Sequence, residues 1–281
     1  MKTFRSLLFV PGSRPERFDK ALTSGADAVC IDLEDAVPPP DKENARGHVL
    51  DYLKERNENI CAIGVRINGL DTLDGFRDVL GLADSNIRPD FIMVPKSESS
   101  APLWNLERLL DLRPSQGKRV PIWAVVETVA GMANVSDLAG TCGGRGGILF
   151  GGADYSANIG TDMSWEALFY ARAQLANQSK MMNGGLLDVP FLDTKDDVGL
   201  RTECHRVKAI GFLGKACIHP NQVAIVNEVF SPSAEEIAWA QRVRAANATS
   251  QGNALLLDGK LIDAPVYLRA ERILEQAGIK G

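Results

Sequence analysis

The segment "VPIWAVVETVAGM", residues 120–132, contains the alternation that decides the fold. Residues 120–126 are rich in β-branched side chains and predict a buried strand, whereas the stretch after Glu127 favours a helix. Parallel strands need a crossover connection, and a helix usually provides it. The fold class therefore depends on how often this strand-to-helix pattern recurs.

The same pattern occurs eight times, and each predicted strand is followed by a segment with helical periodicity. Eight consecutive units of this kind predict an α/β fold, a closed TIM (β/α)8 barrel. The predicted strands are residues 6–10, 28–33, 62–67, 91–94, 120–126, 147–150, 185–189 and 214–218.

A C-terminal extension follows the eighth unit. Residues 1–231 are predicted to form the barrel domain, and residues 232–281 are predicted to form a C-terminal helical extension. A polar linker would allow the extension to fold onto its own barrel or onto a second copy. Its expected elements are a helix at about 234–246, a loop at 247–253, a hairpin around Asp258-Gly259 and a helix at 264–278.

The composition excludes several classes of protein. The chain has 281 residues, 45% of them hydrophobic, and a formal charge of −5, so it has no global attraction to nucleic acid or to an anionic membrane. The early apolar run at 7–10 is too short for a signal peptide and is broken by Pro11-Gly12. Five dispersed cysteines indicate buried thiols in a reducing compartment. A cytoplasmic location, with no membrane span, is expected.

Polar residues follow nearly every predicted strand. The active site of a TIM barrel lies at the carboxyl ends of its strands, so we expect these side chains to meet at one rim. A single acid there is equally compatible with capping of the next helix. Several converging acids need a cation or a charged ligand to balance them, which is typical of functional sites. The residues are Arg14, Glu34, Asp35, Arg66, Asn68, Lys96, Glu127, Asp154, Asp188 and His219.

Glu127 and Asp154 are the predicted metal ligands. Carboxylates without histidine or thiolate partners suit a hard cation, and Mg²⁺ commonly takes only one or two protein carboxylates. Glu34 and Asp35 are predicted to assist catalysis by holding metal-bound waters or by fixing Arg66. Capping of the helix near Asp41 is the alternative role for Asp35.

Two cationic regions are predicted to meet anions. The strand alternation at 62–67 points Arg66 into the barrel mouth, where it suits a substrate carboxylate or a developing enolate oxygen. The alternative for Arg66 is an ion pair with Glu34 or Asp35 alone. At the start of the first helix, Arg14 and Lys20 are predicted to bind phosphate, whereas Arg17 is expected on a solvated face.

Two further segments are expected to be structural. Lys96 is predicted to form an ion pair in preference to a substrate imine. The glycine-rich "GGRGG" at 143–147 precedes a strand, so it is expected to be a turn at the opposite face of the barrel, with Arg145 in solvent.

Eight segments in order resemble the citrate lyase beta subunit and malyl-CoA/citramalyl-CoA lyase family of the HpcH/HpaI aldolase superfamily. The resemblance covers essentially the whole chain. The segments are "RSLLFVPGSRPERFDKA" (5–21), "DLEDAVPPPDKENAR" (32–46), "VRINGLDT" (65–72), "MVPKSES" (93–99), "VETVAGM" (126–132), "GGAD" (151–154), "GKACIHPNQV" (214–223) and "GKLIDAPV" (259–266).

This resemblance implies a TIM barrel with Mg²⁺ at Glu127 and Asp154. It also implies that Arg66 contacts the substrate, and Gly152 and Ala153 of the "GGAD" segment are expected to bind it as well. Members of the family commonly form homotrimers or homohexamers, so a homo-oligomer is expected.

The resemblance also assigns roles that the residues alone do not reveal. It implies that Phe9, Arg14 and Lys20 contact coenzyme A. It implies that Asp263 acts as an acid/base, often in the active site of a neighbouring subunit. From the sequence alone, Asp263 is predicted to be the N-cap of the last helix.

The implied reaction is a reversible Claisen-type cleavage of a 3-hydroxyacyl-CoA such as malyl-CoA or citramalyl-CoA. It would give acetyl-CoA and glyoxylate or pyruvate, with Mg²⁺ stabilising oxygen charge. The alternatives are a citrate lyase beta subunit acting on a carrier-protein thioester, a class II pyruvate aldolase acting on free hydroxy-oxo acids, and a non-catalytic scaffold. The segment after the sixth predicted strand is shorter than in dedicated malyl-CoA lyases, so the acyl group stays open.

Overall fold

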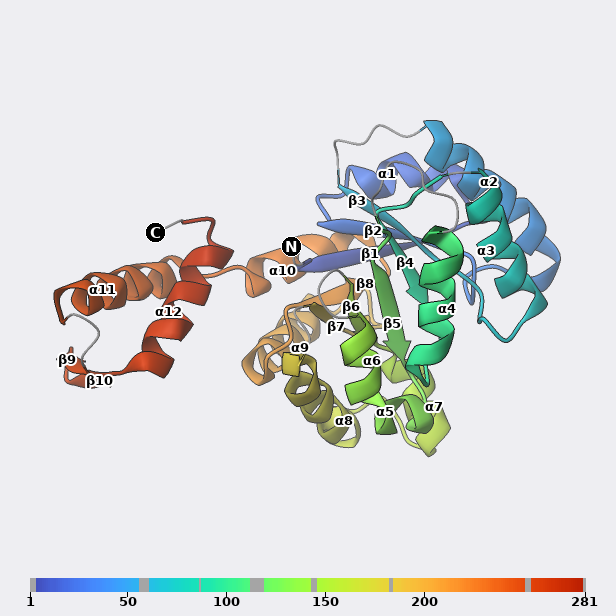
Figure 1. The fold of residues 1–281 in the computed structure, drawn as a ribbon. Helices are drawn as coiled ribbons and strands as arrows, with labels where there is room; N and C mark the ends of the chain where they lie inside the picture. Colours follow the sequence, from blue (N-terminus) through green and yellow to red (C-terminus); the bar gives the residue numbers. More distant parts are fainter. Residues whose placement is uncertain are drawn as a thin grey trace. The chain divides into compact units, whose positions relative to one another are not determined.

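Eight parallel strands close into a barrel in the computed structural model, and helices surround them (Figure 1). Each strand pairs with its neighbour in sequence, and β1 also pairs with β8 to close the barrel. The prediction of a TIM (β/α)8 barrel is confirmed. The structure describes residues 4–55, 61–85, 87–111, 119–142, 146–181, 184–250 and 254–279.

The observed strands lie close to the predicted ones. The largest difference is at β5, which begins at Ile122 rather than Val120. The strands are β1 (Ser6–Pro11), β2 (Ala28–Asp32), β3 (Ala62–Arg66), β4 (Phe91–Val94), β5 (Ile122–Val126), β6 (Gly147–Phe150), β7 (Gly185–Asp188) and β8 (Gly214–Cys217).

Helices connect these strands, and short polar side chains begin several of them. Thr128 caps α5 by accepting a hydrogen bond from the Gly131 N–H, and Asp196 caps α9 in the same way. The helices of this region are α1 (Phe18–Leu22), α2 (Lys42–Glu55), α3 (Leu73–Ser85), α4 (Ser100–Asp111), α5 (Val129–Ala133), α6 (Val135–Cys142), α7 (Gly152–Ile159), α8 (Trp165–Gln178), α9 (Asp197–Ile210) and α10 (Pro220–Phe230), with 3-10 turns η1 (Pro15–Arg17), η2 (Pro39–Asp41) and η3 (Ser179–Met181).

Aromatic rings fill the amino-terminal end of the barrel and form its floor. The rings of Phe4 and Trp123 stack at 5.6 Å, and Phe91 packs against both. Two strands leave room for the indole by beginning with glycine, since a Cβ on Gly147 would lie 2.8 Å from the Trp123 ring and one on Gly185 would lie closer still. The opposite, carboxyl end of the barrel is therefore the end that can open to a ligand.

The second compact unit is Glu228–Gly281, after a first unit of Met1–Asn227. Its core consists of small and aliphatic side chains from both of its helices and from the hairpin between them. Asp258 and Gly259 both adopt positive φ, as a two-residue hairpin turn requires. The predicted helix, hairpin and helix are confirmed as α11 (Ala234–Ser250), β9 (Leu255–Leu257) with β10 (Lys260–Ile262), and α12 (Ala264–Gln276).

Two predictions concern segments near the gaps in the described ranges. The loop predicted at 247–253 is wrong for its first part, because α11 continues to Ser250, through residues such as Ala248 that favour a helix. Residues 251–253 lie outside the described residues, as do Arg145 and the first part of the predicted glycine-rich turn. None of the helices in the described ranges combines the length and apolar character needed to cross a lipid bilayer.

Candidate active site

Arg66 lies in the barrel mouth and is held there by Asp32. Side chains two residues apart share a face of a strand, so Arg66 faces inward like Ala62, which packs against the barrel core. Asp32 occupies the equivalent inward position at the end of β2. Its two carboxylate oxygens accept bonds from Arg66 Nε at 2.7 Å and Nη2 at 2.6 Å. This bidentate pair fixes the plane of the guanidinium.

The remaining side of the Arg66 guanidinium meets the loop after β2. Nη1 lies 2.9 Å from Glu34 Oε2 and 3.7 Å from Asp35 Oδ2, and the ring of Phe9 lies 5.1 Å away. Burial pulls the pKa of Arg66 down, but the carboxylates of Asp32, Glu34 and Asp35 raise it above its ordinary value. Arg66 is therefore a permanent cation, and the predicted pairing with the loop after β2 is present.

Asp32 is a site residue that the sequence analysis missed. Besides binding Arg66, it accepts hydrogen bonds from the backbone N–H groups of Glu34, at 2.9 Å, and Ala36, at 3.1 Å. It therefore shapes the loop that carries Glu34 and Asp35. The alternation that pointed Arg66 inward also places Ala28, Cys30 and Asp32 on one face, and this signal could have identified it.

Glu127 follows β5 and is buried, with 2% of its surface exposed. Its Oε1 accepts a 2.7 Å hydrogen bond from the Lys96 N–H. A Cβ on Gly151 would lie 2.6 Å from Glu127 Oε2, so only glycine fits beside this carboxylate. Burial, followed by the charges of Glu34 and Asp154, raises the pKa of Glu127 to about 8. The structure thus holds Glu127 where its ionised form needs a further positive charge.

Asp154 lies in the first turn of α7, directly after β6, the strand that pairs with β5. Its side chain is exposed, and its charge is one of those that raise the pKa of Glu127. Gly152 and Ala153 precede it at the start of the same helix, where backbone N–H groups lack partners within the helix. Within the "GGAD" segment, Gly151 therefore lies against the Glu127 side chain, and Asp154 is close enough to act on its charge.

The mouth cluster, which comprises Asp32, Glu34, Asp35, Arg66, Lys96, Glu127 and Asp154, has more acids than cations. Among the described residues, no group of three or more His, Cys, Asp and Glu side chains is arranged to hold a metal. The cluster nevertheless fits Mg²⁺, which needs few protein ligands. Glu34 Oε2 is buried and accepts no hydrogen bond, although it lies 2.9 Å from Arg66 Nη1, and the pKa of Glu127 is raised. A cation held by Glu127 and Asp154 would offset the negative charge that raises this pKa.

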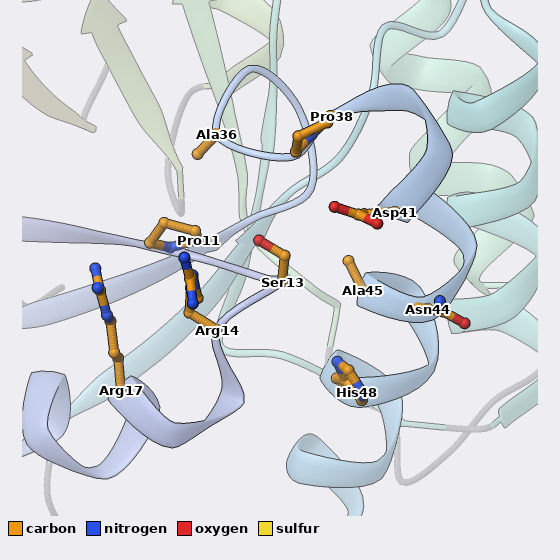
Figure 2. Close-up of a pocket in the computed structure, with 10 residues that line it drawn as sticks. All are labelled: Pro11, Ser13, Arg14, Arg17, Ala36, Pro38, Asp41, Asn44, Ala45 and His48. Carbon is orange, nitrogen blue, oxygen red and sulfur yellow. The ribbon is translucent and has the colours of Figure 1, made fainter.

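A pocket of about 490 Å³ lies beside the start of the first helical turn (Figure 2). Arg14 and Arg17 line it from the segment after β1, whereas Asn44 and His48 line it from α2. The full lining is Pro11, Ser13, Arg14, Arg17, Ala36, Pro38, Asp41, Asn44, Ala45 and His48.

The pocket divides the residues that were expected to bind coenzyme A. Arg14 lines it, Phe9 lies in the mouth against Arg66, and Lys20 is exposed on α1 and is not part of the lining. Arg17, expected on a solvated face, lines the pocket although more than half of its side chain is exposed. The sequence could not show this, because the pocket depends on how α2 packs.

Asp188 does not belong to the mouth, which corrects the expectation that it joins the rim. Leu187 faces the barrel interior, so Asp188 points outward towards the helices. There it is fully buried, within 2.6 Å of Lys215 Nζ and 2.9 Å of Arg172 Nε. Glu203 lies 2.6 Å from the same Lys215 atom. We call Arg172, Asp188, Glu203 and Lys215 the outer cluster.

Two other polar residues have local structural contacts. His219 precedes α10 and accepts a hydrogen bond from the Asn221 N–H through Nδ1 at 3.2 Å. Asp263, in the second unit, accepts a hydrogen bond from the Val266 N–H and caps α12, as predicted from the sequence.

Comparison with known proteins identifies the class of this barrel and then its family. The polar mouth lies where TIM-barrel enzymes have their active sites, and residues 164–281 match the model of a carbon–carbon bond lyase of the TIM-barrel fold. Residues 5–220 match the model of HpcH/HpaI aldolase/citrate lyase. The chain belongs to the HpcH/HpaI aldolase/citrate lyase family, and the resemblance found in the sequence is confirmed.

Two relatives named as lyases, and one solved structure, match this chain over nearly the whole length of both proteins. L-malyl-CoA/beta-methylmalyl-CoA lyase of Cereibacter sphaeroides is 34% identical, over 97% of this chain and 94% of the relative. Citrate lyase subunit beta of Leuconostoc mesenteroides is 32% identical, over 97% and 93%. The structure of CitE from Mycobacterium tuberculosis in complex with magnesium, acetoacetate and coenzyme A has a TM-score of 0.81 and 32% identity, and the match covers 98% of both chains.

Proposed function

We propose that this protein is a Mg²⁺-dependent carbon–carbon lyase that cleaves a 3-hydroxyacyl-CoA carrying a carboxylate, such as citramalyl-CoA or malyl-CoA. The observation that carries the proposal is the pairing of Glu127 and Asp154 at adjacent strand ends beside Arg66, with the pKa of Glu127 raised to about 8. The relatives support the thioester, because one is a malyl-CoA lyase and another was crystallised with magnesium and coenzyme A.

The residues of the mouth cluster would have different roles in the reaction. Glu127 and Asp154 would hold Mg²⁺, which supplies Lewis-acid stabilisation of oxygen charge when bound. Arg66, oriented by Asp32 and Glu34, would stabilise charge on the thioester oxygen. A donor fixed in this way is commonly worth about 3 kcal/mol in the transition state. Gly152 and Ala153 would bind the substrate through the amino end of α7.

Bond cleavage requires two proton transfers. The substrate hydroxyl loses its proton, the carbon–carbon bond breaks, and the electron pair of that bond becomes the enolate of acetyl-CoA. Protonation of that carbon completes acetyl-CoA and leaves glyoxylate or pyruvate. Asp263 is the residue we assign to the carbon proton transfer, and we propose that the second unit supplies it to a neighbouring copy in a homotrimer or homohexamer.

Coenzyme A would extend from the mouth towards the pocket in Figure 2. Arg14 and Arg17 line that pocket and suit the phosphates of coenzyme A. Phe9 belongs to β1, the strand that leads to the pocket, and its ring lies 5.1 Å from Arg66. Lys20 would meet a phosphate outside the pocket lining. An acyl-CoA substrate of this kind is consistent with an enzyme of the cytoplasm.

The test is turnover by purified protein with Mg²⁺ on a panel of acyl-CoA thioesters, with acetyl-CoA release followed by chromatography. We expect cleavage of malyl-CoA or citramalyl-CoA, and a fall in kcat/KM of about tenfold for Arg14→Met, since Arg14 binds a remote part of the substrate. Release of pyruvate from free hydroxy-oxo acids, unaffected by Arg14→Met, would show an aldolase instead.

The similarity to the Leuconostoc citrate lyase subunit supports a second candidate, cleavage of a citryl thioester on an acyl carrier protein. The same assay separates the two. Cleavage of citryl carrier protein with no cleavage of coenzyme A thioesters would favour this second activity.

A further inference from the structure

Lys96 has an unusual backbone conformation. Its φ is 47°, and among the described residues the only other non-glycine residue with positive φ is Asp258, in the hairpin turn. A turn with an Asp-Gly pair commonly contains such a residue, but a lysine there gains no local hydrogen bond from its side chain. Backbone strain of this kind is concentrated at functional sites. Lys96 follows β4 and belongs to the mouth cluster, so this strain lies in the candidate active site.

The backbone contacts explain the conformation but not the lysine. The Lys96 N–H donates to Glu127 Oε1 at 2.7 Å, and the next N–H, of Ser97, donates to Val125 O at 3.0 Å. The turn therefore joins the end of β4 to the end of β5 and positions Glu127. Glycine could make the same contacts without strain. The side chain must account for the presence of lysine.

The Lys96 ammonium reaches into the mouth and is only lightly engaged there. Nζ lies 3.4 Å from Glu34 Oε1, and 54% of the side chain is exposed. A lysine side chain is ordinarily charged at neutral pH, so the contact with Glu34 is an ion pair. Three N–H donors and a weak, long contact leave it able to meet another anion.

Charge in the mouth cluster makes a second cation necessary. Five carboxylates accompany two cations, Arg66 and Lys96, and Arg66 already forms a bidentate pair with Asp32 and contacts Glu34. A substrate carboxylate entering this site would meet an excess of negative charge even beside a divalent cation. Lys96 is the cation at the rim that has contact with solvent and can approach it.

We propose that Lys96 binds the carboxylate of the oxo-acid half of the substrate, while its strained backbone positions Glu127. The inference rests on the proposed function, because it assumes an anionic hydroxyacyl substrate. It predicts opposite effects on the two ligands of the site. Removing the ammonium should strengthen binding of Mg²⁺, which it repels, and weaken binding of the oxo acid, which it attracts.

The experiment is isothermal titration of wild type, Lys96→Met and Lys96→Arg with Mg²⁺ alone, and then with pyruvate or glyoxylate at saturating Mg²⁺. For Lys96→Met we expect Mg²⁺ to bind about threefold more tightly and the oxo acid about tenfold more weakly. Lys96→Arg should restore both affinities towards the wild-type values. Lys54→Met removes an exposed lysine at the far end of α2 and should change neither.

Other outcomes would overturn the inference. If Lys96→Met weakens the binding of both Mg²⁺ and the oxo acid, the lysine only holds the acids in place. If the variant changes neither affinity, or if wild type binds no oxo acid, Lys96 has no anion-binding role. Lys96→Gly provides an independent check, because it should reproduce the binding changes of Lys96→Met while thermal stability holds or rises. These titrations need no turnover, so failure of wild type to cleave acyl-CoA thioesters would count against the proposed function separately.

Discussion

The mouth cluster and the outer cluster both gather several charged side chains, but they differ in the balance of positive and negative charge. The outer cluster has two cations and two acids joined by short contacts. Burial acts to raise the pKa of Asp188, yet Lys215 and Arg172 lower it overall. In the mouth cluster, five acids accompany two cations and the pKa of Glu127 is raised. Buried charges that satisfy one another are structural, whereas an excess of one sign indicates a missing ligand.

The two arginines show the same difference. Arg172 is fully buried, binds Asp188, and lies 5.1 Å from the ring of Trp165, so it is enclosed by the protein. Arg66 is also paired, but it lies at the end of the barrel where a ligand can approach. One of its partners there is Asp35, whose side chain is exposed. Burial of a charged pair alone therefore does not distinguish a site from a scaffold.

The largest expected effect comes from removing the charge of Glu127. Glu127→Gln keeps an acceptor for the Lys96 N–H but loses a metal ligand, so activity should fall about a thousandfold. Because the ionised carboxylate is destabilised by burial and by its neighbours, the metal-free variant should be at least as stable as wild type at pH 8. Initial rates and thermal unfolding without Mg²⁺ measure the two effects. A large loss of stability would place Glu127 with the structural charges.

Lys215→Met should have the opposite profile. It leaves Asp188 and Glu203 without their shared cation in a buried place, and the free energy of unfolding should fall by about 3–5 kcal/mol. Activity per folded molecule should not change. Denaturant unfolding and rates at low temperature test this. The double variant with Asp188→Asn should lose less than the sum of the single variants, and simple additivity would contradict a coupled cluster.

Proton binding at the mouth should make Mg²⁺ affinity depend on pH. The pKa of Glu127 is raised to about 8, so the stability that its proton provides is complete below its ordinary pKa and is lost as pH rises through about 8. Mg²⁺ must displace that proton, so its affinity should rise by up to about tenfold per pH unit between about pH 6 and pH 8. Calorimetry measures the slope. A flat profile in wild type would contradict the raised pKa, and Glu127→Gln should abolish the slope.

The smallest expected effect tests the space beside Glu127. A methyl group on Gly151 would press on the carboxylate, so Gly151→Ala should reduce kcat by about tenfold by displacing Glu127. Gly140 in α6 is the matched control, since a Cβ there meets no atom within 4 Å. Gly140→Ala should stabilise the helix by up to about 1 kcal/mol and leave kcat unchanged. Equal activity of the two variants would show that the mouth tolerates a shifted Glu127.

The barrel could be predicted because the pattern that defines it is local and repeated. Eight short apolar runs, each followed by a helical segment, leave few other arrangements. The hairpin of the second unit could also be predicted, because Asp258-Gly259 is a strong turn pair. The end of α11 could not be predicted, because polar residues such as Asn247 and Ser250 are typical of a loop but here continue the helix.

The site could be predicted in part. Glu127, Asp154 and Arg66 follow their strands directly, and their convergence follows from the barrel alone. Asp188 was expected at the rim and Asp32 was not, although Asp32 faces the mouth and Asp188 faces the helices. That distinction requires knowing which residues of each strand pack inside the barrel. The conformation of Lys96 could not be predicted either, because the segment "VPKSE" contains no glycine, the residue that favours a positive φ.

The aromatic floor of the barrel has a consequence for how such chains can diverge. Trp123 fits only because β6 and β7 begin with Gly147 and Gly185, so a larger residue at either glycine must be accompanied by a smaller one at position 123. A side chain at either glycine is therefore tolerated only together with a smaller residue at position 123. Variation at the closed end would be concerted across three strands, just as Gly151 and Glu127 constrain each other at the opposite end.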